Sequence, residues 1–258
     1  MRVRLRFQKL GKIRFVGHRD VARLFERSLR KVGFPVTYSE GFSPRVKMSF
    51  GLALPTCYES LAEYLDIPIG VSSLDDNGRL EMVGQGAGAS RTPDELVKVL
   101  CDALPHGLDV VNLVVEPRGG PSLQECITEC TWEFDLAGQD VSAASDAVEH
   151  ILASDSVLAQ RKKKGTMVEE DIRSAVHALH VDGESDRGAI IVADLSASPR
   201  VVRPAELLGA LAPGADMGVA RRRHQWISDE GARREPLPQL APSLAPALGA
   251  GTQEGTPE

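Results

Sequence analysis

The sequence predicts an α+β protein with two tandem ferredoxin-like (βαββαβ) domains, the second one degenerate, and a disordered C-terminal tail. Strand-like and helix-like hydrophobic periods alternate over the first 115 residues in the order strand, helix, two or three strands, helix, strand. The same order recurs more weakly up to residue 228, after which Pro, Gly, Ala and Glu dominate. We therefore expect domains at residues 1–116 and 122–228 and a tail at 229–258.

The first strand and the first helix have the clearest patterns. Basic and apolar residues alternate over residues 2–7, so a strand here carries arginines on one face and apolar side chains on the other. A helix is expected over 18–32, because its apolar residues recur at helical spacing and Gly33 can end it. The opposite side of this helix gathers four arginines, namely Arg19, Arg23, Arg27 and Arg30.

The remaining elements rest on shorter signals. Thr92, Pro93 and Glu95 form a capping box that begins a second helix. Strands are expected at 36–39, 46–54, 61–69 and 110–115 in the first domain. In the second domain, strands are expected near 126–136, 157–161, 189–195 and 217–227, with helices near 142–153 and 204–211.

The charge of the chain is strongly asymmetric. The first fifty residues contain thirteen Lys or Arg and three Asp or Glu, whereas the formal net charge of the whole chain is −6. One end of the molecule is thus suited to meet an anion, although a charged face can also be merely solvated.

Several classes of protein are disfavoured. No apolar run approaches the roughly 20 residues that span a bilayer, and residues 1–5 lack a secretion signal, so we expect a cytoplasmic protein. Four cysteines are too few and too scattered for a disulfide framework, and Cys126 and Cys130 have no second pair for a metal site. Phosphate-loop, dinucleotide and zinc-protease motifs are missing. We expect no metal, no cofactor and no catalytic residue.

The helix arginines and the loop at residues 40–47 are the predicted nucleic-acid-binding residues. Arginine forks suit phosphates, and an exposed Phe42 could stack on an unpaired base. Alternatively, Phe42 plugs the hydrophobic core under a turn. The backbone-binding residues of the loop would be Ser43, Arg45 and Lys47. His18 could act as an acid or base, but no partner nucleophile is evident nearby.

Three blocks of sequence, at residues 9–20 (KLGKIRFVGHRD), 38–45 (YSEGFSPR) and 59–66 (ESLAEYLD), resemble the bacterial radical SAM-linked family of unknown function. The resemblance covers roughly residues 1–70. It implies an accessory role in RNA-directed chemistry beside a separate radical SAM protein, and it transfers no catalytic residue. The chain lacks the CxxxCxxC motif of a radical enzyme, so alone it cannot run radical chemistry.

The first hypothesis is therefore a non-enzymatic accessory protein that binds RNA or presents a substrate to a separate radical SAM enzyme. The alternatives are a metal-independent RNA endonuclease that uses His18, and a protein-docking module whose basic face meets an acidic partner. The endonuclease alternative is similar to CRISPR RNA-processing enzymes by fold analogy only.

Overall fold

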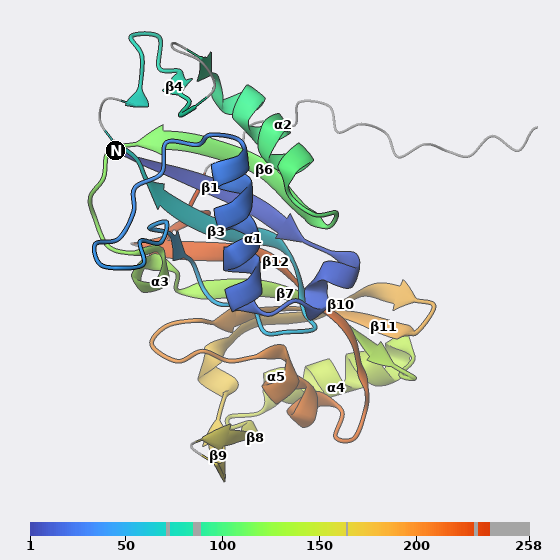
Figure 1. The fold of residues 1–258 in the computed structure, drawn as a ribbon. Helices are drawn as coiled ribbons and strands as arrows, with labels where there is room; N and C mark the ends of the chain where they lie inside the picture. Colours follow the sequence, from blue (N-terminus) through green and yellow to red (C-terminus); the bar gives the residue numbers. More distant parts are fainter. Residues whose placement is uncertain (71–72, 85–88, 164, 230–231, 238–258) are drawn as a thin grey trace, which may run out of the picture.

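The computed structural model describes residues 1–70, 73–84, 89–163, 165–229 and 232–237. Over these residues the chain forms a mixed α/β structure in which a large nine-stranded sheet is flanked by a few helices (Figure 1). No helix in these ranges is both long and apolar enough to cross a membrane.

The N-terminal half begins with strand β1, whose apolar face meets helices α1 and α2. Its main elements are β1 (Arg2–Lys9), α1 (His18–Lys31), β2 (Ser49–Phe50), β3 (Glu59–Pro68), α2 (Pro93–Ala103) and β6 (Leu108–Glu116). Smaller elements are a 3-10 helix (Gly11–Phe15) and the paired strands β4 (Leu80–Glu81) and β5 (Ser90–Arg91).

The C-terminal half contains the remaining helices and strands. Its elements are α3 (Leu123–Cys126), β7 (Glu129–Ala137), α4 (Val141–Ala153), β8 (Leu158–Lys163), β9 (Thr166–Asp171), a 3-10 helix (Arg173–Ala175), β10 (Val176–Ser185), β11 (Gly188–Ser196), α5 (Pro204–Leu211), β12 (Met217–Asp229) and β13 (Ala232–Arg234). Strands β8 and β9 pair only with each other, outside the main sheet.

The strands of each half lie together in the main sheet. Within the N-terminal half the order is β6-β1-β3-β2, and within the C-terminal half it is β12-β7-β11-β10, with antiparallel neighbours throughout. Strand β12 runs parallel to β3, where Arg221 and Arg222 pair with Glu59 and Ser60. This contact makes the two halves one continuous sheet.

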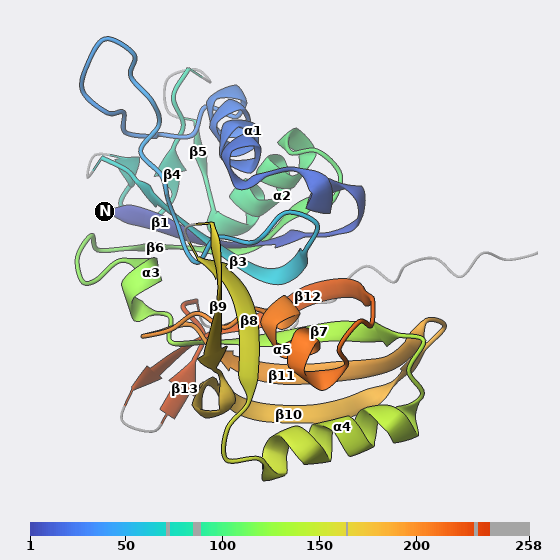
Figure 2. The ribbon, with the colours of Figure 1, turned by 90° about the horizontal axis from the view of Figure 1, so that it is seen from below.

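Two hydrophobic clusters fill the interior, one under each pair of helices. In the N-terminal half, Val3, Leu5 and Phe7 of β1 pack against Phe25 and Leu29 of α1. The C-terminal cluster joins β7, β11 and β12 to α4 and α5. Helices α1 and α2 lie over one face of their strands, as Figure 2 shows.

The strongest sequence signals correspond to real elements. Strand β1 and helix α1 begin at the expected residues, and Gly33 has φ of 71°, the left-handed conformation that ends many helices. The capping box of α2 is present: the Glu95 N–H donates to Thr92 Oγ1 at 3.2 Å, and the Thr92 N–H donates to Glu95 Oε2 at 2.8 Å.

Two expected strands at 36–39 and 46–54 are largely wrong. Residues 36–48 form isolated bridges, Val36 with Ile69 and Tyr38 with Val46, and only β2 is a strand. Pro35 and Pro44 interrupt this stretch, and proline donates no ladder hydrogen bond. Strand β10 is not predicted from the sequence, because its polar residues hide the alternation of apolar and polar side chains. The expected strand at 157–161 corresponds to β8, which lies outside the main sheet.

The expectation of disorder from residue 229 is wrong for residues 232–237. Strand β13 pairs with β12, and Leu237 is only 1% exposed. Glu235 forms an ion pair with Arg6 at 2.6 Å, and the Pro236 carbonyl accepts a hydrogen bond from Arg4 at 3.3 Å. We call residues 232–237 the C-terminal strap. The rest of the predicted tail, at 230–231 and 238–258, lies outside the described residues.

Candidate functional site

Helix α1 presents its arginines because its other side is fixed in the core. Val21, Phe25 and Leu29 are buried, and Ser28 Oγ donates to the Ala103 carbonyl of α2 at 2.9 Å. Any arginine at the opposite positions must therefore face solvent. All eight sequence-predicted residues are exposed, namely Arg19, Arg23, Arg27, Arg30, Phe42, Ser43, Arg45 and Lys47.

The exposed cations differ in their partners. Arg23 pairs with Asp20 at 2.8 Å and Arg30 with Glu26 at 2.6 Å, both along the helix. Exposed pairs of this kind contribute only about 0.2–1 kcal/mol, so either arginine can exchange its carboxylate for another anion. In the described part of the chain no carboxylate lies within ion-pair distance of Arg19 or Arg45.

The loop after α1 is closed by its own backbone and places its aromatic residue outside. The Ser39 N–H donates to the Arg45 carbonyl at 2.8 Å, and the Arg45 N–H donates to Ser39 Oγ at 3.0 Å. Phe42, at the tip, is fully exposed. It is therefore not a plug of the hydrophobic core, and that alternative is wrong.

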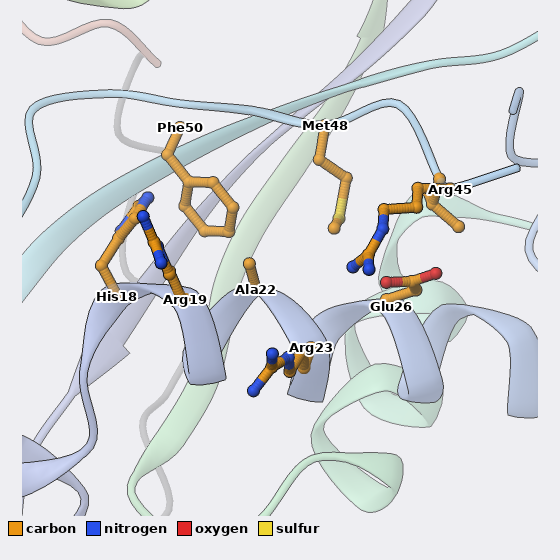
Figure 3. A pocket seen from close by; sticks show the side chains of 9 residues that line it. His18, Arg19, Ala22, Arg23, Glu26, Arg45, Met48 and Phe50 are labelled. Atoms are coloured by element: carbon orange, nitrogen blue, oxygen red, sulfur yellow. The ribbon is translucent and has the colours of Figure 1, made fainter. Parts of the chain in front are cut away.

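A groove runs between α1 and residues 45–50, as Figure 3 shows. We call it the α1 groove. Its volume is about 350 Å³. Its lining residues are His18, Arg19, Ala22, Arg23 and Glu26 from α1, and Arg45, Val46, Met48 and Phe50 from the facing segment.

The groove unites only some of the predicted residues. Arg19 and Arg23 of the helix line it together with Arg45 of the loop, although 22 residues or more separate them in sequence. Arg27 instead lines a second hollow beside α1, of about 500 Å³, which Arg23 also lines. Arg30 lies against the ring of Tyr38, 5.6 Å from its centroid. Phe42, Ser43 and Lys47 are outside the groove lining.

His18 is placed as a packing residue at one end of the groove. Its ring meets Phe50 edge-on, with 4.8 Å between the centroids. No hydrogen bond joins His18 to a carboxylate or hydroxyl in the described ranges. His18 and Phe50 therefore form part of the groove wall, and no neighbour of His18 in the described ranges is placed to transfer a proton.

The arginines of β1, which the sequence places on an outer face, are mostly buried. Arg4 grips both oxygens of Asp66, at 2.7 and 2.8 Å, and Arg6 pairs with Glu235 of the C-terminal strap. Arg2 is held by Glu116 at 2.7 Å. These cations are committed to the fold and do not extend the exposed basic surface.

The three arginines at 221–223 are also held in ion pairs with carboxylates of the fold. Arg222 is 1% exposed and pairs with buried Glu63 at 2.6 Å, which links β12 to β3. Arg221 pairs with Glu59 at 2.9 Å, and Arg223 with Glu133. Although burial opposes ionisation of Glu59, the hydrogen bonds from Arg221 and the Gly11 N–H hold its pKa below the ordinary value.

Sequence reasoning also misses a buried amine close to the α1 groove. Lys9, at the end of β1, is 3% exposed and donates to the Arg14 carbonyl at 3.1 Å. Burial lowers the pKa of Lys9, and the charge of nearby Glu63 opposes this effect. With His18 and Phe50, both groups line a small hollow of about 10 Å³. To predict from the sequence that Lys9 and Glu63 lie close together, one would have to know that β1 pairs with β3.

Comparisons with known proteins give a family and no activity. A bacterial family described as an uncharacterized protein conserved in bacteria, DUF2344, matches residues 2–204. No curated protein matches the chain. The matched region includes α1, the loop and every residue that lines the α1 groove. Since the match covers most of the 258 residues, the chain belongs to the DUF2344 family.

Proposed function

We propose that this chain is an accessory protein that binds RNA through the exposed cations of α1 and the following loop. The observation that carries the proposal is the meeting of Arg19, Arg23 and Arg45 at one groove, where Arg19 and Arg45 have no carboxylate partner in the described residues. Such guanidinium groups suit phosphate oxygens, and their attraction for a polyanion is strong because they are accessible.

The exposed aromatic at the loop tip supports RNA over an acidic protein. Phe42 offers a free ring beside Arg45 and Lys47, and bases stack on such rings without regard to sequence. An acidic protein would need only the charges. The ring and the cations together favour a ligand that has both aromatic faces and negative charge.

The wider role of the protein rests on the three blocks that resemble the radical SAM-linked family. We infer that the chain presents bound RNA to a separate radical SAM enzyme and supplies no catalytic residue itself. The order of strands in each half, with two helices between them, supports ferredoxin-like units as the framework.

The test is RNA binding by a matched pair of double variants. Changing Arg19 and Arg45 to Gln should weaken binding of a labelled single-stranded RNA by about tenfold or more, because two charge-assisted contacts are lost. Changing Lys162 and Arg187 to Gln removes the same charge from exposed sites in the C-terminal half and should change affinity less than twofold. Equal losses in both variants, or no binding by the wild type, would contradict the proposal.

A further inference from the structure

The floor of the α1 groove is apolar, which a site for phosphate alone does not require. Ala22 lies opposite Met48 and Phe50, and the arginines stand at the edges (Figure 3). The small side chain of Ala22 leaves the space between helix and loop open. A thioether and a ring edge are good contacts for a flat aromatic group.

The size of the groove limits what can enter. Its volume of about 350 Å³ is at the lower end of the range of small-molecule sites, about 300–1,000 Å³. A single base with its sugar phosphate is of this class, whereas a double helix is far too wide to enter. A base within a duplex is also stacked and paired, and only an unpaired base can turn into such a groove.

The charges at the edge suit the phosphate of the same nucleotide. Arg19 stands on the helix and Arg45 on the facing segment, so they can reach phosphates on either side of an inserted base, whereas Arg23 points away from Met48 in Figure 3. The one carboxylate in the lining, Glu26, is already paired with Arg30 at 2.6 Å. Glu26 lies beside Arg45 in Figure 3, so its charge repels least an anion held at the Arg19 end of the groove.

Resting on the RNA-binding role proposed above, we propose that the α1 groove holds one unpaired nucleotide, with its base between Ala22 and Met48 and its phosphate on the arginines. The ligand class is thus single-stranded RNA, and duplex RNA is excluded from the groove. An acidic peptide would satisfy the arginines but leave the apolar floor without a flat partner.

The direct test follows the methyl group of Met48 by NMR in protein labelled at methionine methyl groups. AMP should shift the Met48 signal through the ring current of its base, and ribose 5-phosphate, which lacks the base, should shift it much less. Met167, which is 58% exposed on the β8–β9 hairpin, is the internal control and should not move. Equal shifts with AMP and ribose 5-phosphate would overturn the proposal.

A variant that fills the groove separates this proposal from general RNA binding. Ala22→Leu should weaken binding of single-stranded RNA and of AMP about fivefold or more, since loss of one stacked base costs at least that much. Ala143→Leu, the same change at an exposed position of α4, should have no effect. Circular dichroism checks that both variants are folded.

The outcomes are distinguishable. If RNA binds the Ala22→Leu variant as tightly as the wild type while the Arg19 and Arg45 double variant loses affinity, RNA binding stands and base insertion is wrong. If duplex RNA binds as tightly as single-stranded RNA, or if poly-glutamate competes as well as RNA, base insertion is also wrong. If no RNA binds at all, the proposed function itself fails.

Discussion

Strand β1 and helix α1 both carry arginines at regular spacing, but the two rows do different things. The β1 row is mostly buried and held by Asp66, Glu116 and Glu235. The α1 row is exposed, and its ion pairs are short-range contacts along the helix. The β1 row supplies three and the α1 row four of the thirteen cations in the first fifty residues, so charge counting alone does not separate a structural arginine from a binding one.

The difference follows from what covers each face. Strand β1 lies inside the sheet, between β3 and β6, so side chains on its second face meet neighbouring carboxylates and the C-terminal strap. Helix α1 is an outer layer, and its second face meets solvent and the segment at 38–50. An arginine on a central strand needs a partner, whereas one on an outer helix is free to take a ligand.

The largest expected effect is the loss of a buried β1 arginine. Arg4→Met should lower the free energy of unfolding by about 3–5 kcal/mol, because buried Asp66 loses two charge-assisted hydrogen bonds and keeps only Arg2, at 3.2 Å. Arg27→Met, on the exposed face of α1, should change it by no more than about 0.5 kcal/mol. Urea denaturation measures both, and similar costs would mean that the two rows are not distinct.

Removing the C-terminal strap tests the β1 row by taking away the partner of Arg6. A chain that ends at Asp229 should lose about 2–4 kcal/mol of stability, because it loses buried Leu237 and the Glu235 partner of Arg6. A chain that ends at Leu237 retains these contacts and is the matched control in thermal unfolding. An unchanged melting temperature after truncation at Asp229 would show that the strap contributes nothing.

A residue near the α1 row should affect binding and not folding. Phe42→Ala should cost about 1–3 kcal/mol of RNA affinity if the exposed ring stacks on a base. Its unfolding free energy should stay within about 0.5 kcal/mol, since the ring has no core contact to lose. Binding curves and thermal melts on this one variant suffice. A loss of stability with unchanged RNA affinity would contradict a stacking role for Phe42.

The smallest effect concerns the ion pair between the halves and depends on pH. Because the pKa of Glu59 is lowered in the folded state, its contribution is complete above its unfolded pKa of about 4.5 and is lost as the pH falls through the folded value. Glu59→Gln should therefore cost about 1–2 kcal/mol at pH 7 and progressively less below pH 4.5. A cost that is constant from pH 7 to pH 3 would show that the charge of Glu59 is not responsible.

The sequence predicts what local patterns determine and misses what distant residues decide. The helix at 18–32 and the capping box at Thr92 are encoded by neighbours, so both match the structure. The burial of Arg4 depends on Asp66 and Pro236, which lie 62 and 232 residues away along the chain. The α1 groove likewise needs residues 45–50 to return opposite α1, and no spacing rule foresees that placement. The sequence names the eight candidate residues, but their division between groove, loop tip and helix flank follows only from the fold.

The salt dependence of RNA affinity tests the separation of the two rows most directly. For single-stranded RNA, four to six phosphate contacts give a slope of log K against log salt of about −3 to −4. Changing Arg23 and Arg27 to Gln should reduce the magnitude of this slope by about 1–1.5, because two contacts are removed. Changing Arg2 and Arg6 to Gln should leave the slope of the folded protein unchanged. A slope near zero in the wild type, or equal reductions in the two double variants, would contradict the assignment of α1 to binding and β1 to the fold.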